Sequence, residues 1–233
     1  MHNFFPSGRT KEGFVIEGEE LRHLLVRRIR IGEEIGVIHE GKIFRCVLKS
    51  ISKNRAVCGI IGTVKTWDPE VCVTLIQAVP QDLKTMDLIV RKVTEIGVSR
   101  LVLTITERSF QKEEIIEKKK ERWLRIVREA MKQCGRPVSL QLEGPVPIDS
   151  VKVDEDVRLF LHRDESALPL SSVKVHKDMS FAVAVGPEGG FSEGDVSKLK
   201  GLGFTPVRIN TYTMRSETAA IVATGFIVTL GGP

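Results

Sequence analysis

The spacing of apolar residues divides the chain into two regions that meet near residue 70. In the first region, β-branched runs at 34–39, 42–51 and 56–64 are separated by the turn-forming sequences EGK and SKNR. This pattern is typical of a small antiparallel sheet or β-barrel. A short helix is predicted ahead of it, over residues 19–30.

In the second region, short apolar runs alternate with helical patterns. One helix places Ile89, Val93 and Ile96 on a single face and is predicted to end at Gly97. A long charged helix is predicted over 113–134, and a last helix over 217–230 is apolar almost all round, which predicts burial. Strands are predicted at 71–79, 100–105, 138–143, 157–161, 180–185 and 206–209.

Alternating strands and helices indicate an α/β fold with a mostly parallel sheet covered by helices on both faces. The segment KTWDPE between the two regions contains Pro69 and is interpreted as a linker. We therefore predict two domains, an N-terminal β-domain over residues 1–68 and an α/β domain over residues 71–233.

The excess positive charge lies entirely in the first region. Residues 1–66 hold 12 Lys and Arg against 7 Asp and Glu, whereas the rest of the chain holds 23 of each. A basic module joined to a neutral one is typical of a protein that binds a polyanion with its first part. The same charges could equally belong to an ordinary solvated surface.

Composition and motifs exclude several protein classes. The longest apolar stretch, AAIVATGFIVTLGG, is too short and too rich in glycine to span a bilayer, and the N-terminus lacks the apolar core of a signal peptide. The four cysteines are far apart, without C-x-x-C, which favours a reducing cytoplasm. No H-E-x-x-H or comparable cluster is present, so no metal site is predicted.

The segment VGPEGGF, residues 185–191, follows a buried strand and contains Gly186, Gly189 and Gly190. Ligands of open α/β sheets bind at the carboxyl ends of the strands, and glycine lets the backbone approach them closely. We interpret the segment as a ligand-binding loop, with a plain strand-to-helix turn as the alternative. Ser192 is predicted to cap the next helix, with Asp195 completing a capping box.

Of three known ligand-binding and catalytic motifs, this loop matches one. G-x-x-x-x-G-K-[ST] and G-x-G-x-x-G are absent, which argues against a nucleotide-phosphate or dinucleotide loop. The sequence GFSEG does match the G-x-S-x-G nucleophile elbow of α/β-hydrolases. That fold requires a histidine after the serine, yet all five histidines precede Ser192. A hydrolase is therefore the disfavoured alternative.

A second unusual segment, NTYTMRSETAA at residues 210–220, also follows a strand and leads into the last helix. Arg215 and Glu217 stand beside apolar sequence, where charge is costly unless it is paired or functional. The simpler interpretation is that they only cap the helix. Because both segments follow strands, we expect them to frame one pocket.

These segments together resemble a known family. VGPEGGFSEGD and NTYTMRSETAA resemble the two C-terminal motifs of the SPOUT class of S-adenosylmethionine-dependent RNA methyltransferases. HLLVRRIRIGEEI, RKVTEIGV, TERS and EAMKQCGR are similar to stretches of one family in that class, the RsmE-type small-subunit ribosomal RNA uridine-N3 methyltransferases. The resemblance covers essentially the whole chain. One departure is Asn210, which stands where the family usually has glycine.

The resemblance implies a PUA-like RNA-binding barrel followed by a trefoil-knotted methyltransferase domain, in a cytoplasmic homodimer. It implies S-adenosylmethionine as cofactor, no metal and no membrane, and N3 of a uridine in 16S ribosomal RNA or the small ribosomal subunit as methyl acceptor. A non-catalytic RNA-binding assembly protein with a vestigial pocket is the alternative outside enzymes.

The resemblance also implies the site residues. Uridine N3–H is a weak acid, so a cation would stabilise negative charge developing on the base. Arg215 is the candidate, Arg136 is the reserve, and Glu217 is a candidate catalytic partner. The expected cofactor-binding residues are Leu161, His162, Gly186, Pro187, Glu188, Gly190, Ile209, Met214, Arg215, Thr218 and Ala219. The expected RNA-binding residues are His23, Arg27, Arg28, Arg30, Arg108 and Arg136.

Overall fold

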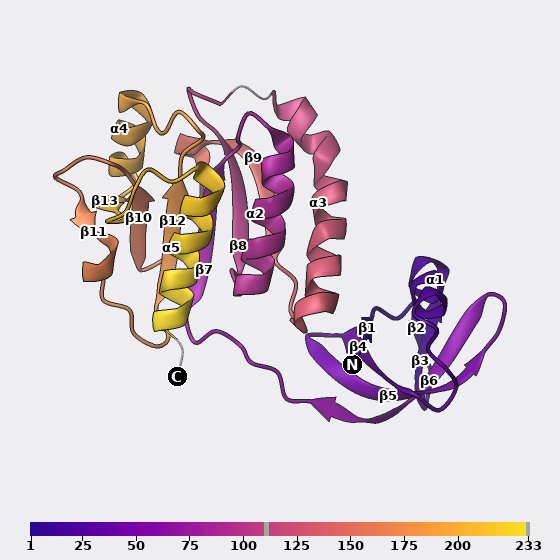
Figure 1. The fold of residues 1–233 in the computed structure, drawn as a ribbon. Helices are drawn as coiled ribbons and strands as arrows, with labels where there is room; N and C mark the ends of the chain where they lie inside the picture. Colours follow the sequence, from indigo (N-terminus) through magenta and orange to yellow (C-terminus); the bar gives the residue numbers. More distant parts are fainter. Residues whose placement is uncertain (110–111, 232–233) are drawn as a thin grey trace. The chain divides into compact units, whose positions relative to one another are not determined.

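A computed structural model describes residues 1–109 and 112–231 of the chain, which form two compact units (Figure 1). The first unit comprises Met1–Trp67 and Arg128–Ser139, and the second comprises Asp68–Val127 and Leu140–Pro233. Helix α3 (Glu113–Cys134) therefore contributes its last residues to the first unit and the remainder to the second.

The first unit is a six-stranded, barrel-like sheet with the strand order β1-β4-β5-β6-β3-β2. All its pairs are antiparallel except β1 with β4, which is parallel. The three predicted strands are present, and three shorter ones complete the sheet. Its elements are β1 (Asn3–Phe4), β2 (Gly8–Arg9), β3 (Gly13–Glu17), α1 (Gly18–Val26), β4 (Glu34–His39), β5 (Lys42–Ile51) and β6 (Arg55–Val64).

Helix α1 is shorter than predicted. It ends at Val26, and Arg27 is its C-cap. Arg28 then adopts a left-handed backbone with φ 56°, which no α-helix can continue. Arg27, Arg28 and Arg30 consequently lie in the exposed turn that follows the helix.

The second unit is built on a seven-stranded sheet with the order β11-β13-β10-β12-β7-β8-β9, and every pair in it is parallel. The predicted parallel sheet is thus confirmed. Strand β9 differs from the predicted strand over 138–143: it begins at Gln141 and continues to Pro147, and Val138 lies exposed ahead of it. The strands are β7 (Cys72–Ala78), β8 (Arg100–Ile105), β9 (Gln141–Pro147), β10 (Val157–Leu161), β11 (Leu168–Pro169), β12 (Ser180–Val185) and β13 (Thr205–Arg208).

Helices cover both faces of this sheet, as predicted. On one face, α2 (Leu83–Ile96) lies beside α5 (Ser216–Leu230), and α5 contacts β7 and β12 (Figure 1). The other face carries the 3-10 helix η1 (Ile148–Ser150) and α4 (Glu193–Gly201) over a core that includes Ile76, Phe160 and Leu199. A second 3-10 helix, η2 (Leu170–Ser172), follows β11.

The prediction that α5 is buried all round is wrong for part of its surface. Ala220, Ala223 and Ile227 are buried, whereas the side chains of Val222 and Leu230 are 37% and 50% exposed. The helix packs against α2 and the sheet along one face only, so its remaining apolar residues face outward in the single chain.

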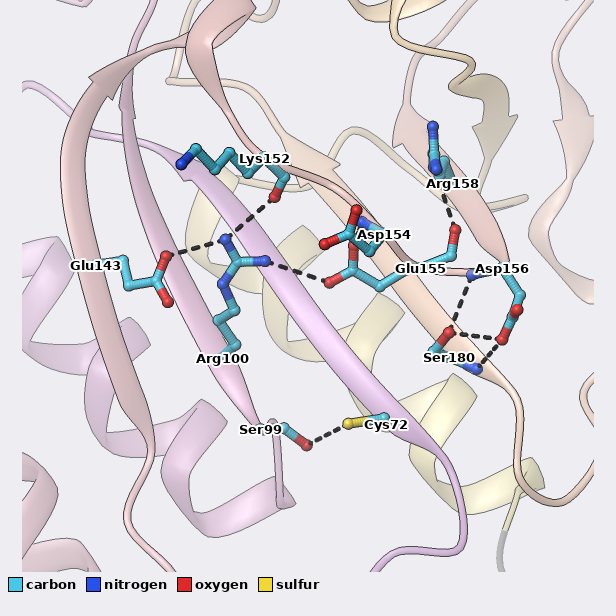
Figure 2. A network of polar contacts seen from close by, with 10 residues as sticks. All are labelled: Cys72, Ser99, Arg100, Glu143, Lys152, Asp154, Glu155, Asp156, Arg158 and Ser180. Atoms are coloured by element: carbon cyan, nitrogen blue, oxygen red, sulfur yellow. Dashed lines mark hydrogen bonds and ion pairs between the residues drawn. The ribbon is translucent and has the colours of Figure 1, made fainter.

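Polar side chains pair with one another at the amino ends of the strands (Figure 2). Arg100 donates to Glu143 over 2.9 Å and lies 3.5 Å from Glu155, and the hydrogen bond to Glu143 raises the pKa of its guanidinium. Asp156 accepts hydrogen bonds from the backbone and hydroxyl of Ser180. The polar groups at the amino ends of the strands are therefore paired with one another. A ligand would bind at the opposite, carboxyl ends of the strands.

Candidate functional site

A cavity of about 700 Å³ opens at the carboxyl ends of β10, β12 and β13. This volume lies within the range of small-molecule sites, roughly 300–1,000 Å³. The two unusual segments frame it together, as the sequence predicted. The predicted cofactor-binding residues that line it are Leu161, His162, Gly186, Pro187, Glu188, Gly190, Ile209, Met214 and Ala219.

The glycines of the first loop are required for different reasons. A Cβ on Gly186 would stand 3.0 Å from the backbone carbon of Gly190, so a side chain there would force the loop backbone to shift. Gly190 adopts φ +68°, and a Cβ on it would meet no atom within 4 Å. Glycine therefore supplies the left-handed backbone at position 190 and leaves open space beside it.

Three separate elements hold this loop in place. The hydroxyl of Ser216, at the start of α5, donates to the carbonyl of Gly186 over 2.5 Å. Arg108, from the segment after β8, donates to the carbonyl of Gly189 over 2.5 Å. The carboxylate of Glu188 accepts from the backbone N–H of Gln81, with both oxygens at 3.1 Å. The loop is thus preorganised by its own chain.

These contacts give two of the predicted site residues a structural role. Arg108 was expected to contact RNA, and Glu188 was expected to bind the cofactor. Both line the cavity, yet each also ties the glycine loop to a neighbouring segment. Their side chains stay exposed at the cavity rim.

Sequence reasoning missed Gln77 and Ser216, which lie buried beneath the loop. The Nε2 of Gln77 donates to the Ser216 hydroxyl over 3.0 Å and to the carbonyl of Ala78 over 2.9 Å. For Gln77, the available signal was a single amide within the largely apolar run VCVTLIQAV. Buried polar side chains of this kind are normally held by hydrogen bonds.

The second loop is anchored by Arg208. Its Nε donates to the Oδ1 of Asn210 over 3.0 Å, and its Nη1 donates to the carbonyls of Ala167, at 3.0 Å, and Glu165. Asn210 thus gives Arg208 a hydrogen-bond acceptor. The strand end and the loop are thereby joined next to the cavity.

Ser192 is the N-cap of α4, as predicted. Its hydroxyl accepts from the N–H of Asp195 over 3.0 Å, and the Asp195 carboxylate accepts from the N–H of Ser192 over 3.1 Å. Both side chains are buried in this capping box. The serine of the G-x-S-x-G match therefore has a structural role at a helix terminus.

Four of the described residues predicted for the cofactor site or catalysis are outside the cavity lining, namely Arg215, Glu217, Thr218 and the reserve cation Arg136. Arg215 is the exposed N-cap residue of α5, next to Met214 and Ser216, which do line the cavity. Glu217 lies in the first turn, where the helix dipole favours a negative charge.

The rim also carries residues that the sequence did not single out, including Arg163, Asp164 and Tyr212. Hydrogen bonds from the backbone and hydroxyl of Ser166, together with nearby His162, lower the pKa of the Asp164 carboxyl. Asp164 is therefore a carboxylate at neutral pH and can accept hydrogen bonds from ligand hydroxyls.

The other predicted RNA-binding residues belong to the first unit. Arg27, Arg28 and Arg30 are exposed, whereas the Nδ1 of half-buried His23 lies 3.1 Å from the Nζ of Lys132. Arg136, also predicted as the reserve catalytic cation, donates from Nε to the carbonyl of Val138 over 2.6 Å.

One group of possible metal ligands occurs among the described residues, formed by Glu20, His23 and Glu129. The ammonium of Lys132 lies 3.0 Å from Glu20 and 2.7 Å from Glu129, besides its contact with His23. The cluster therefore forms an ion-pair network around a lysine.

Across the described part of the chain, the helices are too short or too polar to cross a membrane.

Comparison with known proteins agrees with this geometry. Family models described as an RNA methyltransferase domain and an RNA methyltransferase PUA domain match residues 68–228 and 16–61. The chain is 41% identical to the ribosomal RNA small subunit methyltransferase E of Aquifex aeolicus over 221 residues, which cover 95% of this chain and 96% of the relative.

Two solved structures are similar over their whole length. A putative methyltransferase from Legionella pneumophila in complex with its cofactor SAM has a TM-score of 0.88 at 28% identity, covering 100% of this chain and 99% of the other. The ribosomal RNA small subunit methyltransferase E from Neisseria gonorrhoeae, bound to S-adenosyl methionine, has a TM-score of 0.86 at 26% identity, covering 100% and 98%.

Proposed function

Because this chain belongs to the small-subunit ribosomal RNA methyltransferase E family, we propose that it methylates N3 of a uridine in that RNA. The methyl donor is S-adenosylmethionine, which the two similar structures hold. The observation that carries the proposal is the glycine loop, which three elements hold at the carboxyl ends of parallel strands around a cavity of suitable volume.

The cavity has the groups that this cofactor requires. Adenine presents donors and acceptors that loop backbone can satisfy, and the open space beside Gly190 admits it. Leu161 and Ile209 supply apolar walls, and the Asp164 carboxylate can accept from sugar hydroxyls. S-adenosylmethionine supplies an electrophilic methyl group, so the task of the protein is in-line positioning rather than covalent catalysis.

The acceptor nitrogen loses a proton during the transfer, so negative charge develops on the uracil oxygens. A guanidinium nearby would stabilise that charge. We propose Arg215, which adjoins two cavity-lining residues, with Arg136 as the reserve. Glu217 is proposed as the partner of Arg215; the alternative is that it stabilises only the start of helix α5.

The two units divide the work in this proposal. Residues 1–68 bind RNA through the exposed arginines after α1, and residues 71–233 bind the cofactor and carry out the reaction.

The cytoplasm, where ribosomes are, is the proposed location. A homodimer is favoured by Val222 and Leu230, because a second copy would cover these exposed apolar side chains of α5. The threading of the chain is proposed to form the trefoil knot of the SPOUT class.

The proposal is tested by methyl transfer to small ribosomal subunits, and separately to naked 16S ribosomal RNA, from cells that lack the enzyme. Radiolabelled S-adenosylmethionine reports transfer, and mass spectrometry of digested nucleosides identifies the product. We expect a single 3-methyluridine. Methylation at another atom would overturn the N3 assignment, and RNA binding without transfer would favour the non-catalytic alternative.

A further inference from the structure

Tyr212 is an aromatic side chain that folding does not use. It is the one tyrosine of the sequence, it lines the cavity, and it is 97% exposed. A tyrosine ring normally contributes roughly 150–250 Å² of buried surface to a core or an interface. At this position the ring can contribute that surface only to something that arrives from solvent.

The ring stands on a segment whose two ends are fixed. At the first end, Arg208 binds the side chain of Asn210, and the N–H of Thr211 donates to the carbonyl of Ile209 over 2.8 Å. At the second end, the buried hydroxyl of Ser216 is bonded to Gly186. The segment between these two anchors therefore holds Tyr212 at the rim of the cavity.

We propose that the Tyr212 ring is the stacking platform for the target base, a pyrimidine turned out of the RNA. The inference rests on the proposed function, because it requires a nucleobase as methyl acceptor. Enzymes that modify a base inside structured RNA or DNA must first remove it from the stack. Proteins commonly receive such a base on an aromatic side chain.

The position of the ring favours the acceptor base over the adenine of the cofactor. The cavity itself contains enclosing apolar residues, among them buried Val207 and Phe191 and half-buried Leu161, which suit an adenine ring. A ring that is almost fully exposed encloses nothing. Arg163 is exposed on the same rim and can pair with a phosphate next to the extruded nucleotide.

The first test is kinetic and compares Tyr212→Phe, Tyr212→Leu and Tyr212→Ala. Single-turnover transfer to unmethylated small subunits is measured at saturating cofactor and varied RNA concentration. Phenylalanine keeps the stacking surface and should retain near wild-type kcat/KM. Leucine and alanine should lower kcat/KM for RNA by roughly 5- to 100-fold, as for a lost base stack. Affinity for S-adenosylmethionine should stay within about twofold in every variant.

The matched control is Leu168→Ala. It removes another exposed apolar side chain, from the short strand β11 that pairs with β13, but Leu168 does not line the cavity. It should leave kcat/KM unchanged. Wild-type activity in Tyr212→Ala would overturn the proposal, as would a loss of cofactor affinity that accounts for the whole defect. A wild-type enzyme that transfers no methyl to RNA would instead refute the proposed function.

The second test observes the ring directly. Because the chain has one tyrosine, protein labelled with 3-fluorotyrosine gives a single ¹⁹F resonance from position 212. The resonance should shift when a methylatable ribosomal RNA fragment binds in the presence of S-adenosylhomocysteine. It should shift much less with the same fragment carrying an abasic nucleotide at the target. A full shift with the cofactor product alone, or an equal shift with the abasic fragment, would overturn the proposal.

Discussion

The hydroxyl of Ser216 donates a hydrogen bond of 2.5 Å to the carbonyl of Gly186, 30 residues earlier in the chain. The two residues belong to the two segments that frame the cavity, so this one bond joins them. Gln77 donates to the same hydroxyl from the neighbouring strand β7. All three residues are buried, and the bonds are therefore shielded from competing water.

Ser216→Ala should loosen the cavity. It leaves the Gly186 carbonyl and the Gln77 amide without this partner, at a cost of about 1–3 kcal/mol of unfolding free energy. Affinity for S-adenosylmethionine should also fall, because the glycine loop loses one of the hydrogen bonds that hold it in place. Denaturant unfolding and calorimetry measure the two effects. Thr229→Ala removes an exposed hydroxyl of the same helix and should change neither; equal effects of both substitutions would contradict the special role of Ser216.

Gly190→Val should abolish cofactor binding while the protein stays folded. The new side chain would enter the open space of the cavity, and the left-handed backbone would add a strain of about 1–2 kcal/mol. Gly203→Val is the matched control, since its φ is +82° and it lies outside the cavity lining. Calorimetry should show binding to the Gly203 variant only. Undiminished affinity in a folded Gly190→Val protein would remove this loop from the cofactor site.

Ser192→Ala should cost about 1 kcal/mol of stability and leave methyl transfer near wild type, because the hydroxyl caps helix α4. Thermal unfolding and single-turnover transfer at saturating cofactor measure the two effects. A variant of unchanged stability without activity would require the nucleophile interpretation of the G-x-S-x-G match to be reopened.

Arg215→Ala should reduce single-turnover kcat by roughly 10²- to 10³-fold with little change in cofactor affinity, as for the loss of a group that stabilises an oxyanion. Lysine should rescue only in part, because it lacks the planar fork of the guanidinium. The rate of the alanine variant should partly recover at higher pH, where more uridine has already lost its N3 proton. Equal rates for wild type, Arg215→Lys and Arg215→Ala would exclude Arg215 as the stabilising cation and leave Arg136 as the candidate.

Substituting the exposed arginines after α1 should weaken RNA binding and its dependence on salt. Arg27→Gln, Arg28→Asn and Arg30→Gln remove charge, and asparagine tolerates the left-handed backbone at position 28. Each lost phosphate contact should reduce the slope of log affinity against log salt by roughly 0.7–0.9. Arg45→Gln is the control, because Arg45 pairs with Glu34 at 3.0 Å. An unchanged slope in the triple variant would show that these arginines are only a solvated surface.

Features with a local cause could be predicted from the sequence alone. Helix α2 ends at Gly97 because that residue adopts a left-handed backbone, and α4 begins at Ser192 because its own side chain caps it. Both causes act within one turn of the chain, and the apolar run that predicted β12 is likewise a local pattern. The strand-to-helix position of the glycine loop followed from the same local patterns.

Features that depend on distant partners were decided by the tertiary structure. Glu188 and Arg108 were expected at ligands, yet their side chains also hold Gln81 and Gly189, because the sheet order places β7 between β12 and β8. The exposure of Val222 and Leu230 on α5 likewise depends on which face of that helix packs against α2 and the sheet. Sequence determined the elements and the residue types available at the site. Side-chain partners were decided only when the parallel sheet brought separate strand ends together, because such contacts depend on distance in space rather than along the chain.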